Sequence, residues 1–152
     1  MPGQYRNVIP NFVYWAMQKK SLPLTGTGDE TRDFTYVLDL VQGLVKAGFY
    51  EEAIGKAFNL ASGKETKIKD LISMVNKATG NPKPIKKFPS RKWDTKKRLL
   101  ASIDLAEKII HYKPITNFED GLNANMKWFK NNWKKIQSAA DFPVGMSSAV
   151  RK

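Results

Sequence analysis

One arginine, Arg32, stands at the exit of a polar, glycine-rich turn and at the entry to an extended segment. The surrounding residues, 26–43, read GTGDETRDFTYVLDLVQG. Residues 33–37 are β-rich and alternate, and an apolar helical pattern begins near Asp39. A guanidinium held at the start of a strand suits phosphate, because its planar fork can donate two parallel hydrogen bonds to anionic oxygens. By itself, this motif predicts an anion-binding arginine and nothing more specific.

The other residue types exclude several kinds of site. The 152-residue chain has no cysteine and a single histidine, His111. Disulfides, thiolate catalysis and cysteine or histidine metal clusters are therefore excluded. The longest apolar run, residues 12–17, is too short to span a bilayer, and the N-terminus has no basic region followed by an apolar core. These features predict a domain-sized cytoplasmic protein with no membrane partner.

The net charge of +12 is unevenly distributed. Residues 1–63 hold 6 basic and 6 acidic side chains, whereas residues 64–152 hold 20 basic and 8 acidic ones. Residues 83–98 alone carry eight basic side chains and one acid, Asp94. A lysine-rich solvated face is the plainer interpretation of this cluster, and an anion site is the sharper one. Both stay open on composition alone.

Hydrophobic periodicity predicts several helices separated by short strands. The expected helices cover residues 8–20, 39–48, 67–79, 102 or 104 to about 110, and a longest stretch after 117. The expected strands cover residues 22–25, 31–37, 57–61 and 85–88. The predicted caps are Asn7, Asp39 and Asn117 at helix starts and Gly80 at a helix end.

Strands that alternate with helices indicate a mixed α/β architecture. The strands are nevertheless few and short. Residues 57–61, AFNLA, have the pattern of a strand buried on both faces, and such a strand needs neighbours to pair its backbone groups. The chain offers few candidates for that role, which indicates a piece of something larger.

Four blocks follow one another along the chain: NVIP at 7–10, TRDFTYV at 31–37, FNLASG at 58–63, and RKWD at 91–94 followed by ASID at 101–104. In this order they resemble the extended short-chain dehydrogenase/reductases of the NAD-dependent epimerase/dehydratase family. The resemblance covers about residues 3–136 and is greatest to UDP-glucose 4-epimerase-type enzymes. It implies the helix-rich C-terminal, substrate-binding portion of a Rossmann-type α/β fold, without the N-terminal dinucleotide-binding half. The matching domain prediction is a nucleotide-sugar-binding portion at 1–137 and a flexible tail at 138–152.

The resemblance also implies a substrate site. Asn7 and Val8 would lie against the nucleotide diphosphate, and the backbone around Pro23 and Thr25 would read the edge of the base. These four positions come from two separate stretches of the chain, so the site depends on their meeting in the fold.

A diphosphate clamp is the centre of the implied site. Arg32 and Arg91 would hold the diphosphate, and Asp94 would hold the ribose hydroxyls. The side-chain chemistry agrees, because two guanidinium groups can neutralise two phosphates and a carboxylate accepts hydrogen bonds from a diol. Without the resemblance, Arg32 beside Asp33 would equally fit a surface ion pair. Among the departures from the family pattern, Phe34 replaces a frequent tyrosine and His111 a frequent glycine.

The family's catalytic parts do not appear in the sequence. Gly26-Thr27-Gly28 is no substitute for the NAD-binding turn, because acids follow it and no helix opens there. None of the five tyrosines is followed four residues later by lysine, so the Tyr-x-x-x-Lys pair is missing. We therefore expect no catalytic residue, metal or cofactor site on this chain, with NAD belonging to the complete family enzyme. Whether the chain is an enzyme stays open.

Three functions remain in consideration. The preferred one is the UDP-sugar-binding half of an NAD-dependent epimerase/dehydratase, partnered by an N-terminal Rossmann half or by copies of itself. The second is a non-catalytic nucleotide-sugar-binding module. The third, least favoured, is a basic nucleic-acid-binding protein that uses residues 83–98. Because half of a fold leaves apolar surface uncovered, we also expect the isolated chain to aggregate, to self-associate or to unfold with weak cooperativity.

Overall fold

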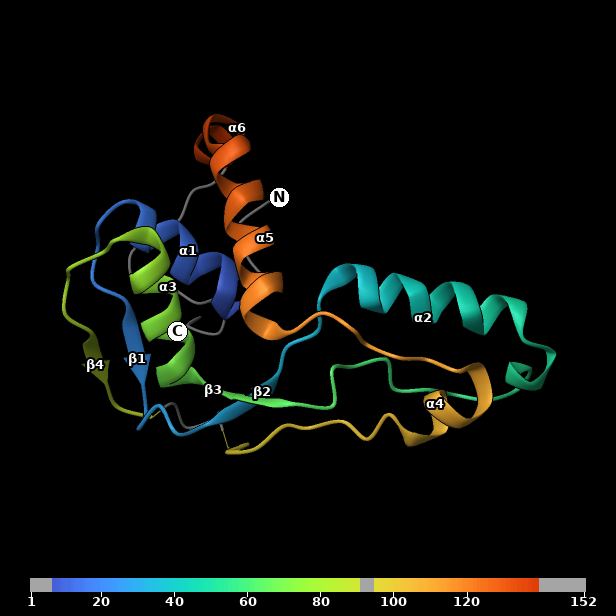
Figure 1. Ribbon diagram of the computed structural model, residues 1–152. Coiled ribbons are helices and arrows are strands. Elements are labelled where there is room, and N and C mark those ends of the chain that lie inside the picture. The colour runs from blue at the N-terminus through green and yellow to red at the C-terminus, as the bar shows by residue number, and fades with distance from the viewer. Residues whose placement is uncertain (1–6, 91–94, 140–152) are drawn as a thin grey trace.

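The computed structural model describes residues 7–90 and 95–139, which form the helix-rich arrangement shown in Figure 1. The elements are α1 (Val8–Met17), β1 (Pro23–Thr25), β2 (Thr31–Asp33), α2 (Val37–Phe49), the 3-10 turn η1 (Glu51–Ala53), β3 (Glu65–Lys67), α3 (Ile68–Thr79), β4 (Lys86–Phe88), α4 (Asp104–Ile110), α5 (Phe118–Asn131) and α6 (Trp133–Ala139).

The four strands form two separate two-stranded sheets. β1 pairs in parallel with β4, and β2 pairs antiparallel with β3, so that Arg32 lies opposite Thr66. An isolated bridge adds Arg98 beside Thr31. The fold class is therefore the predicted helix-rich α/β arrangement with few strands. Sheets this small cannot organise the chain, so helix packing does.

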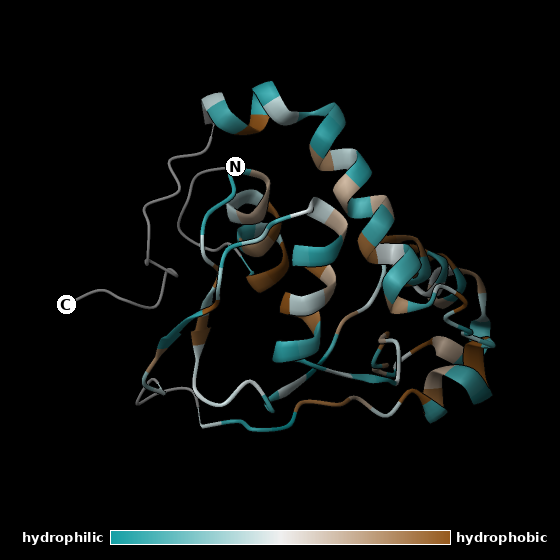
Figure 2. Cartoon of the chain, turned by 60° about the vertical axis from the view of Figure 1, so that its left-hand side comes forward, coloured by the Kyte–Doolittle hydropathy of each residue, from teal (hydrophilic) through white to brown (hydrophobic). Residues whose placement is uncertain are grey.

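The larger of two regions, the α1–α3–α5 lobe, is built around α1, α3, α5 and β1. Val13 of α1 and Leu71 of α3 are completely buried at its centre. Burial at i, i+3 or i+4 spacing explains the helices, because each places one apolar stripe toward the others. The ring of Trp133 lies 5.2 Å from that of Tyr14, which brings the start of α6 onto α1. In Figure 2 the ribbons of α5 and α6 are mostly in the hydrophilic colour, with hydrophobic residues between.

The smaller region, the α2–α4 arm, projects to one side of the lobe in Figure 1. Its buried hydrophobic residues are Ala53, Ala106, Ile110 and Tyr112. The Tyr112 hydroxyl donates a hydrogen bond to the Ala61 carbonyl at 2.9 Å. Gly43 of α2 lies so close that an added Cβ would be 2.7 Å from the Leu60 side chain and 2.8 Å from the Tyr112 ring. This small cluster packs α2 against α4.

Local signals predicted several elements correctly. Asn117 caps α5, since its side chain accepts a hydrogen bond from the Asp120 N–H at 2.9 Å. Gly80 ends α3 in the left-handed conformation, with φ 59°. The predicted strands at 22–25 and 85–88 correspond to β1 and β4, and α4 begins at Asp104 as one of the two predicted starts.

The strand predicted at 57–61 is wrong. Residues 56–60 have no regular secondary structure, and Phe58 and Leu60 are only half-buried. Within the described ranges no strand pairs with this segment, and an apolar run without a partner cannot satisfy its backbone as a strand.

Three further boundaries differ from prediction. α1 ends at Met17 rather than residue 20, because Lys19 turns to φ 56° and its ammonium donates to the Thr79 and Gly80 carbonyls at 2.6 and 2.8 Å. The strand predicted at 31–37 stops at Asp33. α2 starts at Val37, so Asp39 lies inside the helix and does not cap it.

Candidate functional site

The described residues of the predicted site all lie in the α1–α3–α5 lobe or on β2 beside it. Asn7 occupies the N-cap position of α1, is exposed, and its side chain makes no capping hydrogen bond. Val8 is half-buried and packs against the lobe core. The exposed Asn7 amide is therefore presented beside the positive end of the helix dipole, where negative charge is favoured.

Pro23 and Thr25 flank the buried Leu24 in β1, and both are half-buried. They pair with Lys86 and Phe88 of β4. Among the described residues β1 has a strand on one edge only. Its other edge can present main-chain groups to a ligand.

Arg32 is half-buried in β2, and its Nη1 donates to the Thr31 carbonyl at 2.7 Å. The neighbouring Asp33 is used differently. Its carboxylate accepts hydrogen bonds from the Ser62 and Gly63 N–H groups at 3.0 and 3.1 Å, and from the Ser62 hydroxyl. Asp33 therefore ties the 58–63 block to β2, a role that the sequence did not reveal.

Arg91 and Asp94 lie outside the described residues. The segments on either side of them can be placed. Ser90 approaches Gly26, its Oγ lying 3.1 Å from where a Cβ at Gly26 would be. Downstream, Thr31 donates its N–H to the Lys97 carbonyl at 2.9 Å, and Leu99 donates to the Thr31 carbonyl at 3.2 Å. Both flanks thus run beside the elements that carry Thr25 and Arg32.

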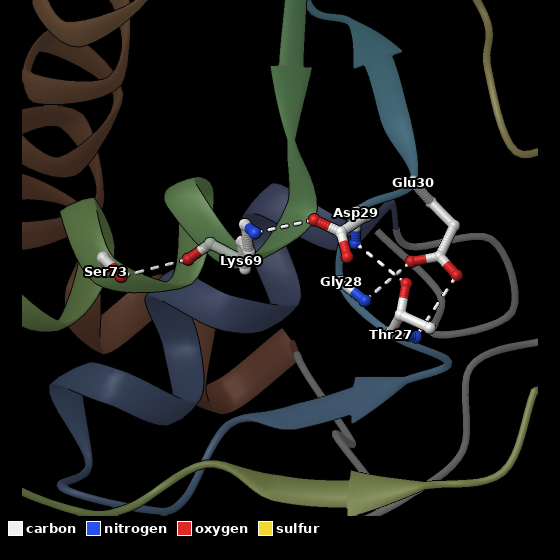
Figure 3. Close-up of polar contacts among 6 residues, drawn as sticks. All are labelled: Thr27, Gly28, Asp29, Glu30, Lys69 and Ser73. Atoms are coloured by element: carbon white, nitrogen blue, oxygen red, sulfur yellow. Dashed lines mark hydrogen bonds and ion pairs between the residues drawn. The ribbon is translucent and has the colours of Figure 1, made fainter.

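The glycine-rich turn holds a carboxylate of its own (Figure 3). The N–H groups of Thr27 and Gly28 donate to the Glu30 carboxylate at 3.3 and 2.8 Å, and the Asp29 N–H donates to the Thr27 hydroxyl at 3.1 Å. Lys69 forms an ion pair with Asp29 at 2.6 Å. Because internal acceptors engage these donors, the turn does not fit the pyrophosphate of NAD.

The same contacts act on the acidity of Glu30. Desolvation acts to raise the pKa of this carboxyl group, but the backbone N–H donors together outweigh it and hold the pKa below its usual value of 4.5. The turn is therefore stabilised by an ionised Glu30.

The basic cluster is partly neutralised. Arg98 makes a bidentate ion pair with Glu65, both contacts being 2.8 Å, and this guanidinium lowers the pKa of Glu65. Lys86 and Lys87 are exposed on β4, with the Lys86 ammonium 5.3 Å from the centre of the Phe88 ring. The open positive charge therefore lies next to the strand that carries Thr25.

The described residues offer neither a metal site nor a membrane-spanning helix. In the part of the chain that the structure describes, no group of three or more His, Cys, Asp or Glu side chains could hold a metal ion. No helix within 7–90 and 95–139 is long and apolar enough to cross a bilayer.

Known proteins match this chain in sequence. The profile of the NAD dependent epimerase/dehydratase family matches residues 1–61. UDP-glucuronic acid decarboxylase 1 of Danio rerio is 30% identical over 145 residues, which cover 95% of this chain and 34% of that protein.

Solved structures match it in fold as well. An epimerase of Methanothermobacter thermautotrophicus superposes with a TM-score of 0.90 and 48% identity, over 93% of this chain and 42% of that one. The Bordetella bronchiseptica enzyme WbmF, solved in complex with NAD+ and UDP, gives a TM-score of 0.76 and 35% identity, over 88% and 39% of the two chains. The chain therefore spans about a third to two fifths of the length of these relatives.

Proposed function

We propose that this chain, which matches the C-terminal portion of extended short-chain dehydrogenase/reductases of the NAD-dependent epimerase/dehydratase family, binds a UDP-sugar and anchors its diphosphate. The observation that carries the proposal is the 35% identity, over 88% of this chain, to an enzyme solved with NAD+ and UDP. The order of the four family blocks supports it. Asn7 of the first block lies in the lobe, Arg32 of the second lies on β2 beside it, and β1 adds an open strand edge.

In the proposed site, Arg32 donates its forked N–H groups to the diphosphate. Arg91 adds a second guanidinium, and Asp94 accepts hydrogen bonds from the ribose hydroxyls. Asn7 contributes its amide where the α1 dipole favours an anion. The backbone at Pro23 and Thr25 reads the edge of the base. The chain's own work is to bind the nucleotide and fix its orientation.

The chemical step, in this proposal, belongs to a dinucleotide-binding part of the same fold. That part would hold NAD, which supplies hydride transfer when bound. The glycine turn of this chain engages Glu30 and does not fit that cofactor. The proposal therefore assigns no catalytic residue to the described segments. Without a dinucleotide-binding partner, the chain would serve as a nucleotide-sugar-binding module.

Titration of UDP into the purified chain by calorimetry tests the proposal. We expect saturable binding by the wild type and an increase in Kd of about ten- to a hundredfold in Arg32→Ala, because a charge-assisted hydrogen bond contributes about 1.5–3 kcal/mol. Lys108→Ala, which removes an exposed positive charge from α4, is the matched control and should bind like the wild type.

Two outcomes oppose this function. No saturation at millimolar UDP would sink it, as would equal losses in Arg32→Ala and Lys108→Ala. Binding of single-stranded nucleic acid, without sequence preference and falling steeply with salt, would instead favour a role for the exposed lysines near β4.

A further inference from the structure

Exposed lysines gather where α1 ends, α3 ends and β4 begins. They come from three separate segments of the chain and define the basic patch: Lys19, Lys20, Lys77, Lys83, Lys86 and Lys87. In Figure 1 the turn after α1 and the loop between α3 and β4 lie on the side of the lobe that faces away from the α2–α4 arm. The fold therefore collects on one surface charges that are dispersed along the sequence.

Hydrogen bonds hold the three segments of the basic patch together. The Lys19 ammonium donates to two carbonyls at the end of α3, at 2.6 and 2.8 Å. Asn81, which is 6% exposed, donates its Nδ2 to the Lys20 carbonyl at 2.9 Å. The Lys86 N–H donates to the Leu22 carbonyl at 2.9 Å. The backbone that carries the lysines is therefore fixed by internal contacts.

No acid balances this positive charge. Residues 11–28 and 71–90, which supply all the lysines of the basic patch, contain no Asp or Glu. Elsewhere the charges are paired, as in Lys69 with Asp29 and Arg98 with Glu65, whereas no ion pair within 7–90 and 95–139 reaches the patch. Ordinary protein surfaces intersperse the two signs. The patch is thus suited to attract an anionic surface that approaches to within about 8 Å, the Debye length at physiological salt.

Apolar side chains lie among the lysines. Ile85 is 37% exposed and Phe88 is 38% exposed, within a segment, 82–90, that is exposed throughout. The Lys86 ammonium lies 5.3 Å from the centre of the Phe88 ring, so a charge and an apolar group are presented side by side. A lysine can lay its stem along apolar surface while its ammonium stays among charged groups. This combination fits the boundary between lipid headgroups and acyl chains.

The residue types of the basic patch favour lipid over nucleic acid. All of its cations are lysines, whereas the forked guanidinium of arginine is the better group for nucleic-acid phosphates and bases. Proteins that bind single strands also offer aromatic rings on which bases stack. The exposed segment 82–90 has one aromatic ring, Phe88, and the Lys86 ammonium lies over it. Lysines act as point charges, which suits the separate, laterally mobile headgroups of an anionic bilayer.

We propose that the basic patch binds the surface of a bilayer that contains anionic lipids. The lysines contact the headgroups, and Ile85 and Phe88 reach the level where the acyl chains begin. This peripheral contact needs no spanning helix, so it differs from the sequence-based expectation of no membrane partner, which rested on the length of the apolar runs. It goes beyond the proposed function, because it requires neither UDP nor Arg32.

Vesicle flotation tests the proposal, because protein aggregates stay at the bottom of the gradient. The probes are vesicles of phosphatidylcholine alone and vesicles of equal parts phosphatidylcholine and phosphatidylglycerol. We expect the wild type to float only with the anionic vesicles and to be released as salt is raised. Adhesion through the exposed apolar residues of α2 would not distinguish the two kinds of vesicle.

Charge variants locate the contact. Lys86→Gln combined with Lys87→Gln should weaken binding to the anionic vesicles about ten- to thirtyfold, because each lysine near such a surface contributes roughly fivefold in affinity. Lys108→Gln combined with Lys113→Gln removes the same charge from exposed positions in the arm. This matched control should bind like the wild type.

Ile85 provides a second readout that charge alone would not move. Ile85→Ser should weaken binding to the anionic vesicles about threefold and leave its salt dependence unchanged, because the loss is apolar. The Lys86→Gln/Lys87→Gln variant should instead reduce the salt dependence. Far-ultraviolet circular dichroism checks that each variant keeps its helices.

Four results would overturn the proposal. They are equal flotation with the two kinds of vesicle, equal losses in the patch and arm variants, no effect of Ile85→Ser, and tighter binding to a single-stranded RNA than to anionic vesicles at the same salt. Flotation is measured without UDP and UDP binding without vesicles, so failure of lipid binding is distinguishable from failure of the proposed function.

Discussion

The helices of the α1–α3–α5 lobe bury their apolar faces, whereas α2 of the α2–α4 arm exposes its apolar face. Among the described residues, thirteen hydrophobic side chains are buried together in the lobe and four in the arm, so the lobe has the larger core. The arm places the apolar face of α2 outward and binds its polar face inward, through contacts of Asp39, Gln42 and Lys46 with the backbone of residues 111–116. α2 is thus inverted with respect to an ordinary surface helix. The described residues of the predicted nucleotide site lie on or beside the lobe, whereas the arm leaves the apolar face of α2 exposed.

The largest effect should come from the lobe core. Leu71→Ala in α3 removes a completely buried side chain and should cost about 2–5 kcal/mol of unfolding free energy. Leu44→Ala on the outer face of α2 should change it by about 0.5 kcal/mol or less. Urea denaturation of both variants makes the comparison. Similar losses of unfolding free energy in the two variants would contradict this difference, because they would mean that the outer face of α2 is packed in the isolated chain.

The inner side of α2 should be sensitive where its outer side is not. Gly43→Ala forces a Cβ against Leu60 and the anchored Tyr112 ring, and should cost about 1–3 kcal/mol. Gly48→Ala meets no described atom within 4 Å and should add about 0.5–1 kcal/mol, because alanine is the better helix former. Chemical denaturation should give opposite signs for these two glycines. Equal effects would contradict the inverted orientation of the helix.

His111 lies at the end of α4, where the segment that contacts α2 begins. It has φ 51° and ψ 38°, a left-handed conformation that costs any residue with a Cβ about 1–2 kcal/mol. His111→Gly should therefore be about 1 kcal/mol more stable than His111→Ala, since both lose the ring contact with Tyr50 and only glycine relieves the backbone. Thermal unfolding of the two variants makes this measurement. Equal melting temperatures would argue against the left-handed conformation of residue 111.

The smallest expected effect is a pH dependence in the glycine turn beside β2. The folded pKa of Glu30 lies below its usual 4.5, so its ionised form stabilises the fold fully above about pH 4.5, and this contribution is lost as the pH falls through the folded pKa. The melting temperature of the wild type should exceed that of Glu30→Gln most at pH 6–7, and the gap should close in acid. If the difference in melting temperature instead widened in acid, ionised Glu30 would not be the form that stabilises the turn.

Local signals sufficed to predict much of the lobe. The apolar spacing in α3 with glycine at its end, and Asn117 ahead of α5, are read from neighbouring residues, and the structure has both. β3 was missed because Glu-Thr-Lys has no apolar alternation to mark it as a strand. The lobe is predictable because the apolar faces of its helices pack against one another within this chain.

The arm was less predictable because its structure depends on distant contacts. Periodicity marks an apolar stripe on α2 but does not say which way the stripe faces. The orientation is fixed by the Ile115 and Thr116 N–H groups, which lie 76 and 77 positions from Asp39 in the sequence and donate to its carboxylate. The strand expected at 57–61 failed for the same reason, since strand pairing is not a local property. In the candidate site, the residue type and position of Arg32 predict anion binding. Its grouping with Asn7, Thr25, Arg91 and Asp94 comes only from the resemblance to the family.

The most direct test of the division between the two regions is one set of UDP titrations on the wild type, Arg32→Ala, and the Leu44→Gln/Val45→Gln double variant. We expect saturable UDP binding by the wild type. The Kd for UDP should rise about ten- to a hundredfold in Arg32→Ala and stay unchanged in the double variant. No binding by the wild type at millimolar UDP, or an equal loss in both variants, would contradict this division between the two regions.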